Sequence, residues 1–377
     1  MTAGPRRTGF FQNYTRDLTT DELHRLFTRD TRDAYRFFSR HLDLRQFDGL
    51  PWHQRLFSKT KVLFLAFAMR LSPARRAVYA FALVLAIVGL INLVGVERAQ
   101  PGTTWLFLGF VFVNLLVLLE VADRLSLKND LEVAREIQNA MLPGGVHRIA
   151  GVEVVGVSRP ANTVGGDFYD IQPLRDGRLV VAVGDVSGKG SPAALLMALL
   201  LAMFRTLIPL IEDEDLDVSE IAARLNVQVS RHAPGNRFIT LFCGVFTPAT
   251  GELRFVNAGH LPPIVVRADG SIDRLSDGGI ALGMFANATY TSGRAFLGID
   301  DLLAVYSDGI TEAENPAGRP FDDPGLETAL TKDRRAAVPD LAQAVVRAVE
   351  AHTGDVRLAD DLTILLLRRS EAAAAGV

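Results

Sequence analysis

Two long apolar runs without a charged residue dominate the first third of the chain, at residues 77–96 and 99–119. An α-helix rises about 1.5 Å per residue, so about 20 residues cross the roughly 30 Å hydrocarbon core of a bilayer. Buried helices of soluble proteins rarely stay uncharged over this length. The pattern therefore predicts a transmembrane hairpin over residues 77–121, with spans at about 77–96 and 102–121, and makes the lipid bilayer a partner.

The flanks of these runs predict the orientation of the hairpin. The first run is preceded by the basic residues Lys59, Lys61, Arg70, Arg75 and Arg76, whereas the short connection holds one arginine, Arg98. Basic residues beside membrane spans tend to stay on the cytoplasmic side. We therefore expect both ends of the chain in the cytoplasm, and the connection is too short to bind an external ligand.

Residues 1–76 are expected to form a cytoplasmic arm. Thr20-Asp21-Glu22 is typical of a helix start, and apolar residues follow it near helical spacing. Short amphipathic helices on the membrane or on a partner would explain this pattern; a loosely ordered arm is the alternative. The apolar run at 62–71 is too short to span and is expected at the membrane interface.

Helical spacing continues past the second run, over a linker predicted at residues 122–145. Its apolar stripe consists of Leu127, Leu131, Ala134, Ile137 and Met141. Pro143-Gly144-Gly145 then ends the helix. Such a stripe favours a homodimer formed through the linker helix. Packing of the same stripe on the following domain is the alternative.

The periodicity changes near residue 146, where short runs typical of strands begin. They lie at residues 152–157, 168–172, 179–183, 238–246, 253–257, 263–266, 302–306 and 362–367. Apolar helices are expected at 192–210, 218–232 and 338–351. Strands joined by short turns, with helices grouped rather than alternating, predict an α+β domain of antiparallel sheets with helices outside, over residues 146–370.

Composition excludes several classes of protein. The net charge of −3 gives no indication of nucleic-acid binding, so no nucleic-acid partner is expected. The single cysteine, Cys243, lies in an apolar run and is expected in the core. One cysteine cannot form an internal disulfide or a cysteine-based zinc site.

Three aspartates stand apart from the other acidic residues because each lies at the edge of a strongly apolar strand. They are Asp185 after VVAVG, Asp308 after LLAVYS, and Asp360 before the run LTILLL. A carboxylate beside a buried strand needs compensation, which a divalent cation supplies. Oxygen ligands without histidine or cysteine favour Mg²⁺ or Mn²⁺, and several carboxylates can hold two such ions.

Five short motifs come in one order over about 200 residues. They are Gly165-Gly166-Asp167-Phe168-Tyr169-Asp170, Gly184-Asp185-Val186-Ser187-Gly188-Lys189-Gly190, Asn257-Ala258-Gly259-His260, Ser307-Asp308-Gly309 and Asp360-Asp361-Leu362-Thr363. Their order and spacing resemble the SpoIIE/RsbU-like bacterial branch of the metal-dependent, protein phosphatase 2C-like (PPM) Ser/Thr protein phosphatases. The resemblance covers about residues 130–368 and implies a sandwich of two antiparallel sheets flanked by helices, with metal ions in a cleft at one end.

The resemblance also implies roles for single residues. Asp185 would bridge two ions, either Mn²⁺ or Mg²⁺, and the Val186 carbonyl would help to hold one of them. Asp308 and Asp360 would bind the second ion. A water activated by the ions would attack phosphoserine or phosphothreonine without a phosphoenzyme.

Other residues of these motifs receive weaker assignments. Asp167 would act through the water shell of a metal ion, and Asp361 is a less favoured metal ligand than Asp360. Lys189 is expected to be a solvated loop lysine, with phosphate orientation as the alternative. His260 is expected to stabilise a turn. Eukaryotic members of the family have the pattern Asp-Gly-His-Gly-Gly, whereas this chain has Asp185-Val186-Ser187-Gly188-Lys189. The histidine that could protonate the leaving group is therefore absent, and no general acid is assigned.

The resembled family implies the remaining expectations. The substrate would be a phosphorylated regulatory protein, an anti-sigma-factor antagonist of a partner-switching pathway, and the location would be the bacterial inner membrane. Separately, we hypothesise that the linker helix transmits a signal by rearrangement of a dimer. One alternative is a diguanylate cyclase, because Gly165-Gly166-Asp167-Phe168 resembles the GGDEF signature, but the later acidic motifs would then be unexplained. The second alternative is a non-catalytic membrane signalling module whose phosphatase-like domain binds partners.

Overall fold

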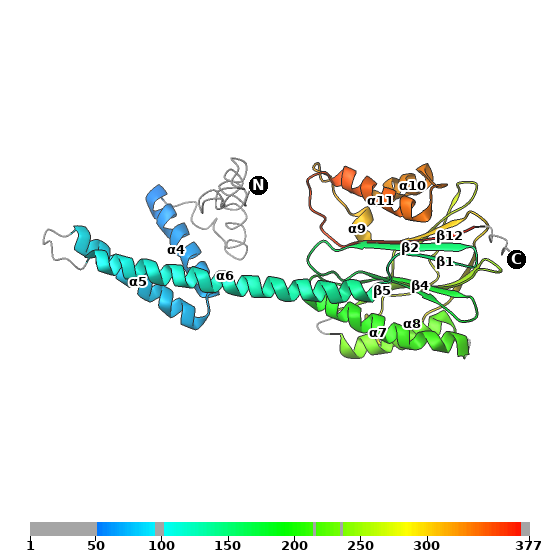
Figure 1. Ribbon diagram of the computed structural model, residues 1–377, viewed down its shortest axis with the longest axis horizontal. Helices are drawn as coiled ribbons and strands as arrows, with labels where there is room; N and C mark the ends of the chain where they lie inside the picture. The colour runs from blue at the N-terminus through cyan, green and yellow to red at the C-terminus, as the bar shows by residue number, and fades with distance from the viewer. Residues whose placement is uncertain (1–50, 95–101, 214–215, 234–236, 371–377) are drawn as a thin grey trace, which may run out of the picture. The chain divides into compact units, whose positions relative to one another are not determined.

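The computed structural model describes residues 51–94, 102–213, 216–233 and 237–370 (Figure 1). Two compact units divide the chain, Met1–Leu125 and Ser126–Val377. The amphipathic helices expected before residue 51 lie outside the described residues. So do residues 95–101, which hold the end of the first predicted span and the connection to the second.

The first unit contains α4 (Trp52–Arg70), α5 (Pro73–Val94) and the N-terminal part of α6 (Gly102–Met141). The backbones of α5 and α6 approach closely at Gly109, where a Cβ atom would lie 3.0 Å from the Ala82 carbonyl oxygen. Near the start of α5, Arg75 forms ion pairs of 3.1 Å with Glu120 and 2.6 Å with Asp123. The apolar run expected at 62–71 belongs to α4, which begins ten residues earlier.

Three described helices are long and apolar enough to cross a membrane, at Pro73–Leu93, Thr103–Met141 and Ser191–Glu212. The first two cover most of the predicted spans, and they leave large apolar side chains such as Ile87 and Leu118 more than half exposed. The third helix contributes buried side chains to a core of the second unit, among them Leu200 and Leu201. Its apolar character is therefore explained by packing within that unit.

The second unit begins with the C-terminal part of α6 and consists mainly of two sheets. One sheet has the order β1-β2-β12-β11-β7-β8. Its strands are β1 (Val146–Ile149), β2 (Val152–Arg159), β7 (Ile264–Val266), β8 (Ile272–Arg274), β11 (Leu302–Tyr306) and β12 (Leu362–Arg369). All its strand pairs are antiparallel.

The other sheet has the order β10-β6-β5-β4-β3, and β9 pairs with β6. Its strands are β3 (Phe168–Pro173), β4 (Leu179–Val186), β5 (Ile239–Thr247), β6 (Glu252–Ala258), β9 (Gly278–Gly279) and β10 (Gly293–Phe296). Its pairs are antiparallel except for the short parallel pair of β6 and β9.

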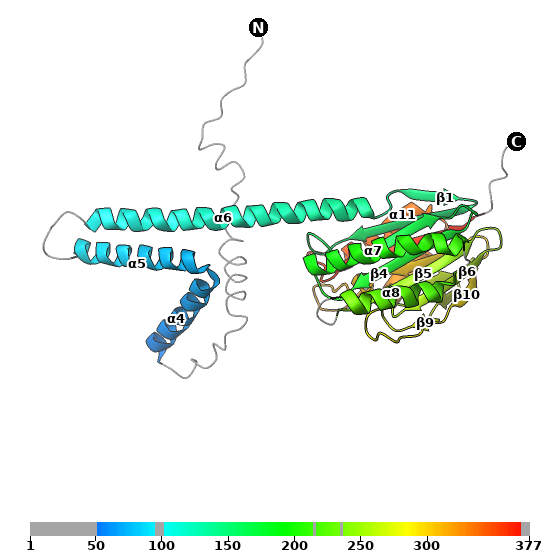
Figure 2. The ribbon, with the colours of Figure 1, turned by 90° about the horizontal axis from the view of Figure 1, so that it is seen from below.

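Helices cover the outer face of each sheet. α7 (Ser191–Asp213) and α8 (Val218–His232) lie on the β3–β6 sheet, whereas α10 (Asp322–Lys332) and α11 (Val338–Thr353) lie on the other (Figures 1 and 2). A short helix, α9 (Asp308–Thr311), follows β11. The predicted α+β sandwich of two antiparallel sheets flanked by helices is confirmed.

Alternation along the strands builds three apolar layers. In β11, Leu302, Ala304 and Tyr306 face the helices, whereas Leu303 and Val305 face the opposite sheet. Successive side chains of a strand point to opposite faces, so a strand that is apolar throughout fits between two covered faces. This burial fixes the strand ends from which the acidic motifs project. Cys243 is fully buried in the core, as expected.

Candidate active site

Four chain segments that are far apart in sequence meet at one end of the sandwich. They are 165–167 before β3, 185–189 at the end of β4, 307–309 after β11, and 360–363 at the start of β12. A Cβ atom on Gly166 would lie 2.9 Å from the Val186 carbonyl oxygen, and one on Gly309 would lie 2.0 Å from the Asp361 carbonyl oxygen. Glycine is thus required for these segments to pack together.

A glycine turn leads from β4 into α7 and leaves Asp185 at the strand end. Gly188 and Gly190 have φ angles of 97° and 75°, a backbone region that favours glycine. Arg237 braces this turn, since its guanidinium donates a 3.0 Å hydrogen bond to the Ser187 carbonyl oxygen. Sequence reasoning missed Arg237, which lies outside the five motifs.

The sequence-predicted aspartates lie within electrostatic reach of one another. Burial, and then the negative charge of Asp308, raise the pKa of Asp185 to about 6. Burial also raises the pKa of Asp308, with repulsion from Asp360 as the next cause. The pKa of Asp167 is raised well above its ordinary value by burial and then by the charge of Asp185. Carboxylates that mutually disfavour ionisation form a site with surplus negative charge; we call Asp167, Asp185, Asp308, Asp360 and Asp361 the acid cluster.

Asp167, which is predicted to act through the water shell of a metal ion, is the most deeply buried carboxylate of the acid cluster. Its side chain is only 3% exposed, and its Oδ2 atom lacks a hydrogen-bond partner. An unpaired buried carboxylate oxygen is costly unless a cation or a donor satisfies it. Within the described residues, however, no three His, Cys, Asp or Glu side chains are close enough together to form a complete metal cage.

Asp361 has a different environment from its neighbour Asp360. Its Oδ1 accepts a hydrogen bond of 2.8 Å from the Ala161 amide, and its Oδ2 accepts one of 2.7 Å from the Gly166 amide. Both oxygens are thus engaged by backbone amides of the loop before β3. These bonds favour a loop-positioning role for Asp361 over metal ligation.

Lys189 neutralises part of the acid cluster. Its Nζ atom lies 2.7 Å from Oδ2 of Asp360, and this contact raises the pKa of the lysine. Lys189 is thus an exposed loop lysine, as expected, and in addition it forms an ion pair with an acid of the cluster. The ammonium is about half exposed, but it pairs with a carboxylate predicted to hold the second metal ion.

His260 lies in a buried turn. Its backbone amide donates a 2.7 Å hydrogen bond to Oδ1 of Asn257, and its Nδ1 lies 2.9 Å from the Thr240 hydroxyl. Burial lowers the pKa of His260 to about 4, so its imidazole is neutral at pH 7. These contacts fit the expected turn-stabilising role.

Gln138, near the end of α6, contacts the loop that carries Asp167. Its side chain is 8% exposed and forms two hydrogen bonds with Gly165. Sequence reasoning did not single out this glutamine. A signal was present, because Gln138 follows Leu131 and Ala134 by seven and four residues and so interrupts an apolar helix stripe with an amide.

Comparison with solved structures defines the class of domain. The protein phosphatase 2C (PP2C) domain of SiaA from Pseudomonas aeruginosa superposes with a TM-score of 0.57 at 20% identity, over 66% of this chain and 98% of that one. A SpoIIE fragment from Bacillus subtilis, containing its PP2C phosphatase domain, has a TM-score of 0.50 at 17% identity, over 60% and 64% of the respective chains. The two-sheet sandwich of the second unit therefore has a PP2C-like fold.

Sequence comparison then gives the family. The model of the family "Stage II sporulation protein E (SpoIIE)" matches residues 175–370, slightly more than half of the chain. The chain belongs to the SpoIIE family, as the motifs predict.

Two relatives show how much of other proteins the chain covers. Protein IcfG from Synechocystis is 28% identical over 68% of this chain, and the match spans only 44% of IcfG. Phosphoserine phosphatase RsbU from Bacillus subtilis is 25% identical over 65% of this chain and 71% of RsbU. The chain thus spans less than half the length of the first of these relatives.

Proposed function

We propose that this protein is a metal-dependent protein serine/threonine phosphatase. The observation that carries the proposal is the acid cluster, in which buried carboxylates repel one another at the mouth of a PP2C-like sandwich. Membership of the SpoIIE family supports a phosphatase, and the name of RsbU supports phosphoserine as the group that is hydrolysed.

The donor set fits two hard divalent cations, Mn²⁺ or Mg²⁺. All the donors are oxygens, Oδ2 of Asp167 is buried without a partner, and a cation would replace repulsion between carboxylates by attraction. Asp185 would be shared by both ions, with the Val186 carbonyl on one, and Asp308 and Asp360 on the other. Asp167 would act through bound water, and bound ions would supply activation of a water and neutralisation of phosphoryl charge.

The protein's own groups define the rest of the reaction. Asp361 holds the loop that positions Asp167, through its hydrogen bonds to backbone amides. His260 is buried and neutral, so it does not serve as the general acid. Protonation of the leaving serine or threonine oxygen is assigned to water or to a group of the substrate. Lys189 must leave Asp360 at least partly when a cation binds there, which frees its ammonium for the phosphoryl group.

The proposed substrate is a phosphorylated regulatory protein of the anti-sigma-factor antagonist type. This assignment rests on the family and on the position of the domain after predicted membrane spans. The proposed location is the bacterial inner membrane, with the phosphatase domain in the cytoplasm. Cysteine labelling in spheroplasts tests the topology. An Arg98→Cys variant should react from outside, whereas a Ser370→Cys variant should react only after permeabilisation.

The linker helix supports a homodimer as part of the proposal. Leu127 and Ile137 of the predicted stripe are 61% and 59% exposed, whereas Leu131, Ala134 and Met141 are half-buried. Exposed apolar side chains at helical spacing suit a second copy of the same helix. Proline at Leu131 or Ala134 should change activity or its regulation; unchanged activity and regulation would exclude a signalling role of the linker.

A phosphatase assay tests the central proposal. Full-length protein in detergent should hydrolyse a phosphoserine peptide with Mn²⁺ and lose this activity in excess EDTA. Asp308→Asn should abolish turnover, whereas the exposed Asp333→Asn should behave like the parent. A folded parent that binds protein partners but shows no turnover with either metal would favour the alternative, a non-catalytic signalling module.

A further inference from the structure

Gln138 makes two reciprocal hydrogen bonds to one loop residue. Its Nε2 donates to the Gly165 carbonyl oxygen at 2.8 Å, and its Oε1 accepts from the Gly165 amide at 3.2 Å. A glutamine amide has one donor group and one acceptor group, and here both are used on the backbone of the same residue, Gly165. All these groups are buried, so water does not compete for them.

Gly165 is held on its other side by the acid cluster. A Cβ atom on Gly165 would lie 2.3 Å from Oδ2 of Asp361, and that same oxygen accepts the Gly166 amide at 2.7 Å. The loop is therefore clamped between the Asp361 carboxylate and the Gln138 amide. Asp167 follows Gly165 by only two residues, so a shift of Gly165 displaces the Asp167 carboxylate.

The end of α6 has other anchors that do not involve Gln138. Arg205 on α7 donates a 2.7 Å hydrogen bond to the Met141 carbonyl oxygen and pairs with the buried Asp170 at 2.9 Å. The Tyr169 hydroxyl donates a 2.8 Å hydrogen bond to the Pro143 carbonyl oxygen. Because these contacts dock the helix end, the two bonds of Gln138 are available to fix the loop.

We propose that Gln138 is a positioning residue of the phosphatase site, which holds Gly165 so that Asp167 is ready to bind the hydrated cation. The inference rests on the proposed function, since it concerns cation binding by the same site. It extends that function to a residue outside the domain core, on α6. Loss of the Gln138 amide should weaken divalent-cation binding without detaching the helix end.

Calorimetric titration of Mn²⁺ into metal-stripped, full-length protein in detergent tests this inference. Gln138→Met keeps the length and packing of the side chain but removes both hydrogen bonds, and it should weaken Mn²⁺ binding about tenfold. Gln138→Glu keeps one acceptor and loses the donor, so it should also weaken binding. Asn139→Met removes an exposed amide from the next position of α6 and should leave the Kd unchanged.

Two further measurements distinguish a positioning role of Gln138 from a purely structural one. A positioning defect raises the Mn²⁺ concentration needed for half-maximal hydrolysis of p-nitrophenyl phosphate, while kcat at saturating Mn²⁺ stays within about twofold of the parent. A purely structural defect lowers the number of binding sites per chain and leaves the Kd of the remaining sites unchanged, which would overturn the inference. Loss of the fold in both Gln138 variants would overturn it too, because the contacts of Arg205 and Tyr169 should suffice.

The parent protein separates this inference from the proposed function. A parent that neither binds Mn²⁺ nor hydrolyses phosphoserine would refute the proposed function itself. A parent that does both, together with a Gln138→Met variant of unchanged Kd, would refute only the role of Gln138.

Discussion

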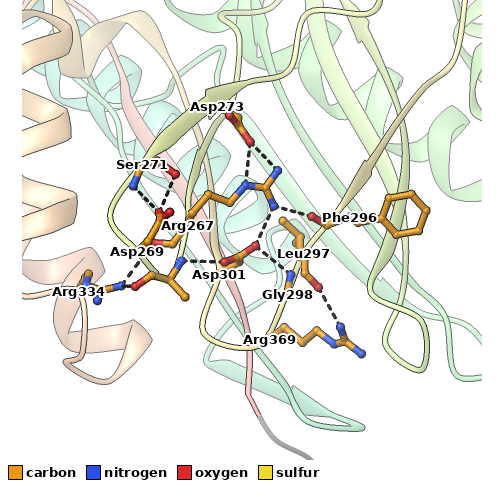
Figure 3. A network of polar contacts seen from close by, with 11 residues as sticks. Arg267, Asp269, Ser271, Asp273, Phe296, Leu297, Gly298, Asp301, Arg334 and Arg369 are labelled. Carbon is orange, nitrogen blue, oxygen red and sulfur yellow. Dashed lines mark hydrogen bonds and ion pairs between the residues drawn. The ribbon is translucent and has the colours of Figure 1, made fainter.

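Two groups of buried and half-buried carboxylates in the same domain differ in how their charge is balanced. In the Arg267–Asp301 network, Asp301 accepts hydrogen bonds of 2.8 Å from Arg267, 2.8 Å from the Ala268 amide and 2.9 Å from the Gly298 amide (Figure 3). Arg267 also pairs with Asp273 at 2.6 Å. Each acid there faces a cation or a backbone donor, which is how proteins stabilise buried charge.

The acid cluster has the opposite balance. The charge of Asp308 raises the pKa of Asp185, and the charge of Asp360 raises that of Asp308. One buried oxygen of Asp167 has no hydrogen-bond partner. Lys189 contributes a positive charge, but it lies on Asp360 and is half exposed. The number and the burial of acids therefore do not mark a functional site by themselves. The mark is negative charge that the fold leaves uncompensated.

Among the predicted changes, a substitution in the acid cluster should have the largest effect, and it should act on catalysis. Asp185→Asn should lower kcat for a phosphoserine peptide about 10³-fold or more, because the carboxylate shared by both cations is lost. The same assay on Asp301→Asn should give the parent kcat per folded molecule. Full activity of the Asp185 variant would show that the acid cluster is not the catalytic site.

The network should respond through stability instead. Asp301→Ala removes one of the two acidic partners of Arg267 and the acceptor of two backbone amides, which should cost about 3 kcal/mol of domain stability. Hydrogen exchange of amides in β7 and β11 measures this loss within the full-length protein. Both tryptophans, Trp52 and Trp105, lie outside the domain, so their fluorescence is not a suitable probe. Unchanged protection would contradict the structural role of the network.

His260 should make the stability of the domain depend on pH. Its pKa of about 4 in the fold is below the unfolded value of about 6.5, so its stabilising effect is complete above pH 6.5 and is lost as the pH falls towards 4. Between pH 7 and 5 the parent should lose about 2 kcal/mol more stability than His260→Gln. Hydrogen exchange at both pH values in EDTA, compared between parent and variant, cancels the contribution of the acids. Equal losses would show that His260 is not buried as described.

The smallest effect distinguishes the two acid groups by its sign. In EDTA at pH 7.5, Asp185→Asn should stabilise the domain by about 1 kcal/mol, because it removes charge repulsion within the acid cluster. Asp301→Ala should destabilise under the same conditions. Hydrogen exchange of β4 amides provides the measurement, and a destabilised Asp185 variant would mean that the fold already compensates this charge.

The sequence predicted the fold class because its periodicity is strong where both faces are buried, as in β11 and β12. The short strands β1, β8, β9 and β10 were not predicted, since pairings of two to four residues depend on neighbouring strands more than on their own residues. α7 is as apolar as the two predicted spans, and its position among strands, rather than its composition, indicated a domain helix.

The acids of the candidate site were predicted because each one sits in a motif at a strand end. The roles of Asp361, Gln138 and Lys189 were not, because each depends on a contact across a large separation in sequence. Asp361 binds amides about 195 residues away, and Lys189 lies 170 residues from Ala359, whose carbonyl oxygen it also contacts. Spacing within a motif carries no information about such contacts.

The most direct test of the account is the number of Mn²⁺ ions that the metal-stripped, full-length protein binds, counted by equilibrium dialysis with EPR detection of free Mn²⁺. The account predicts two ions per parent chain, loss of binding in Asp185→Asn and parental binding in Asp301→Asn. Absence of bound Mn²⁺ in the parent, or binding that is unchanged in Asp185→Asn, would contradict it.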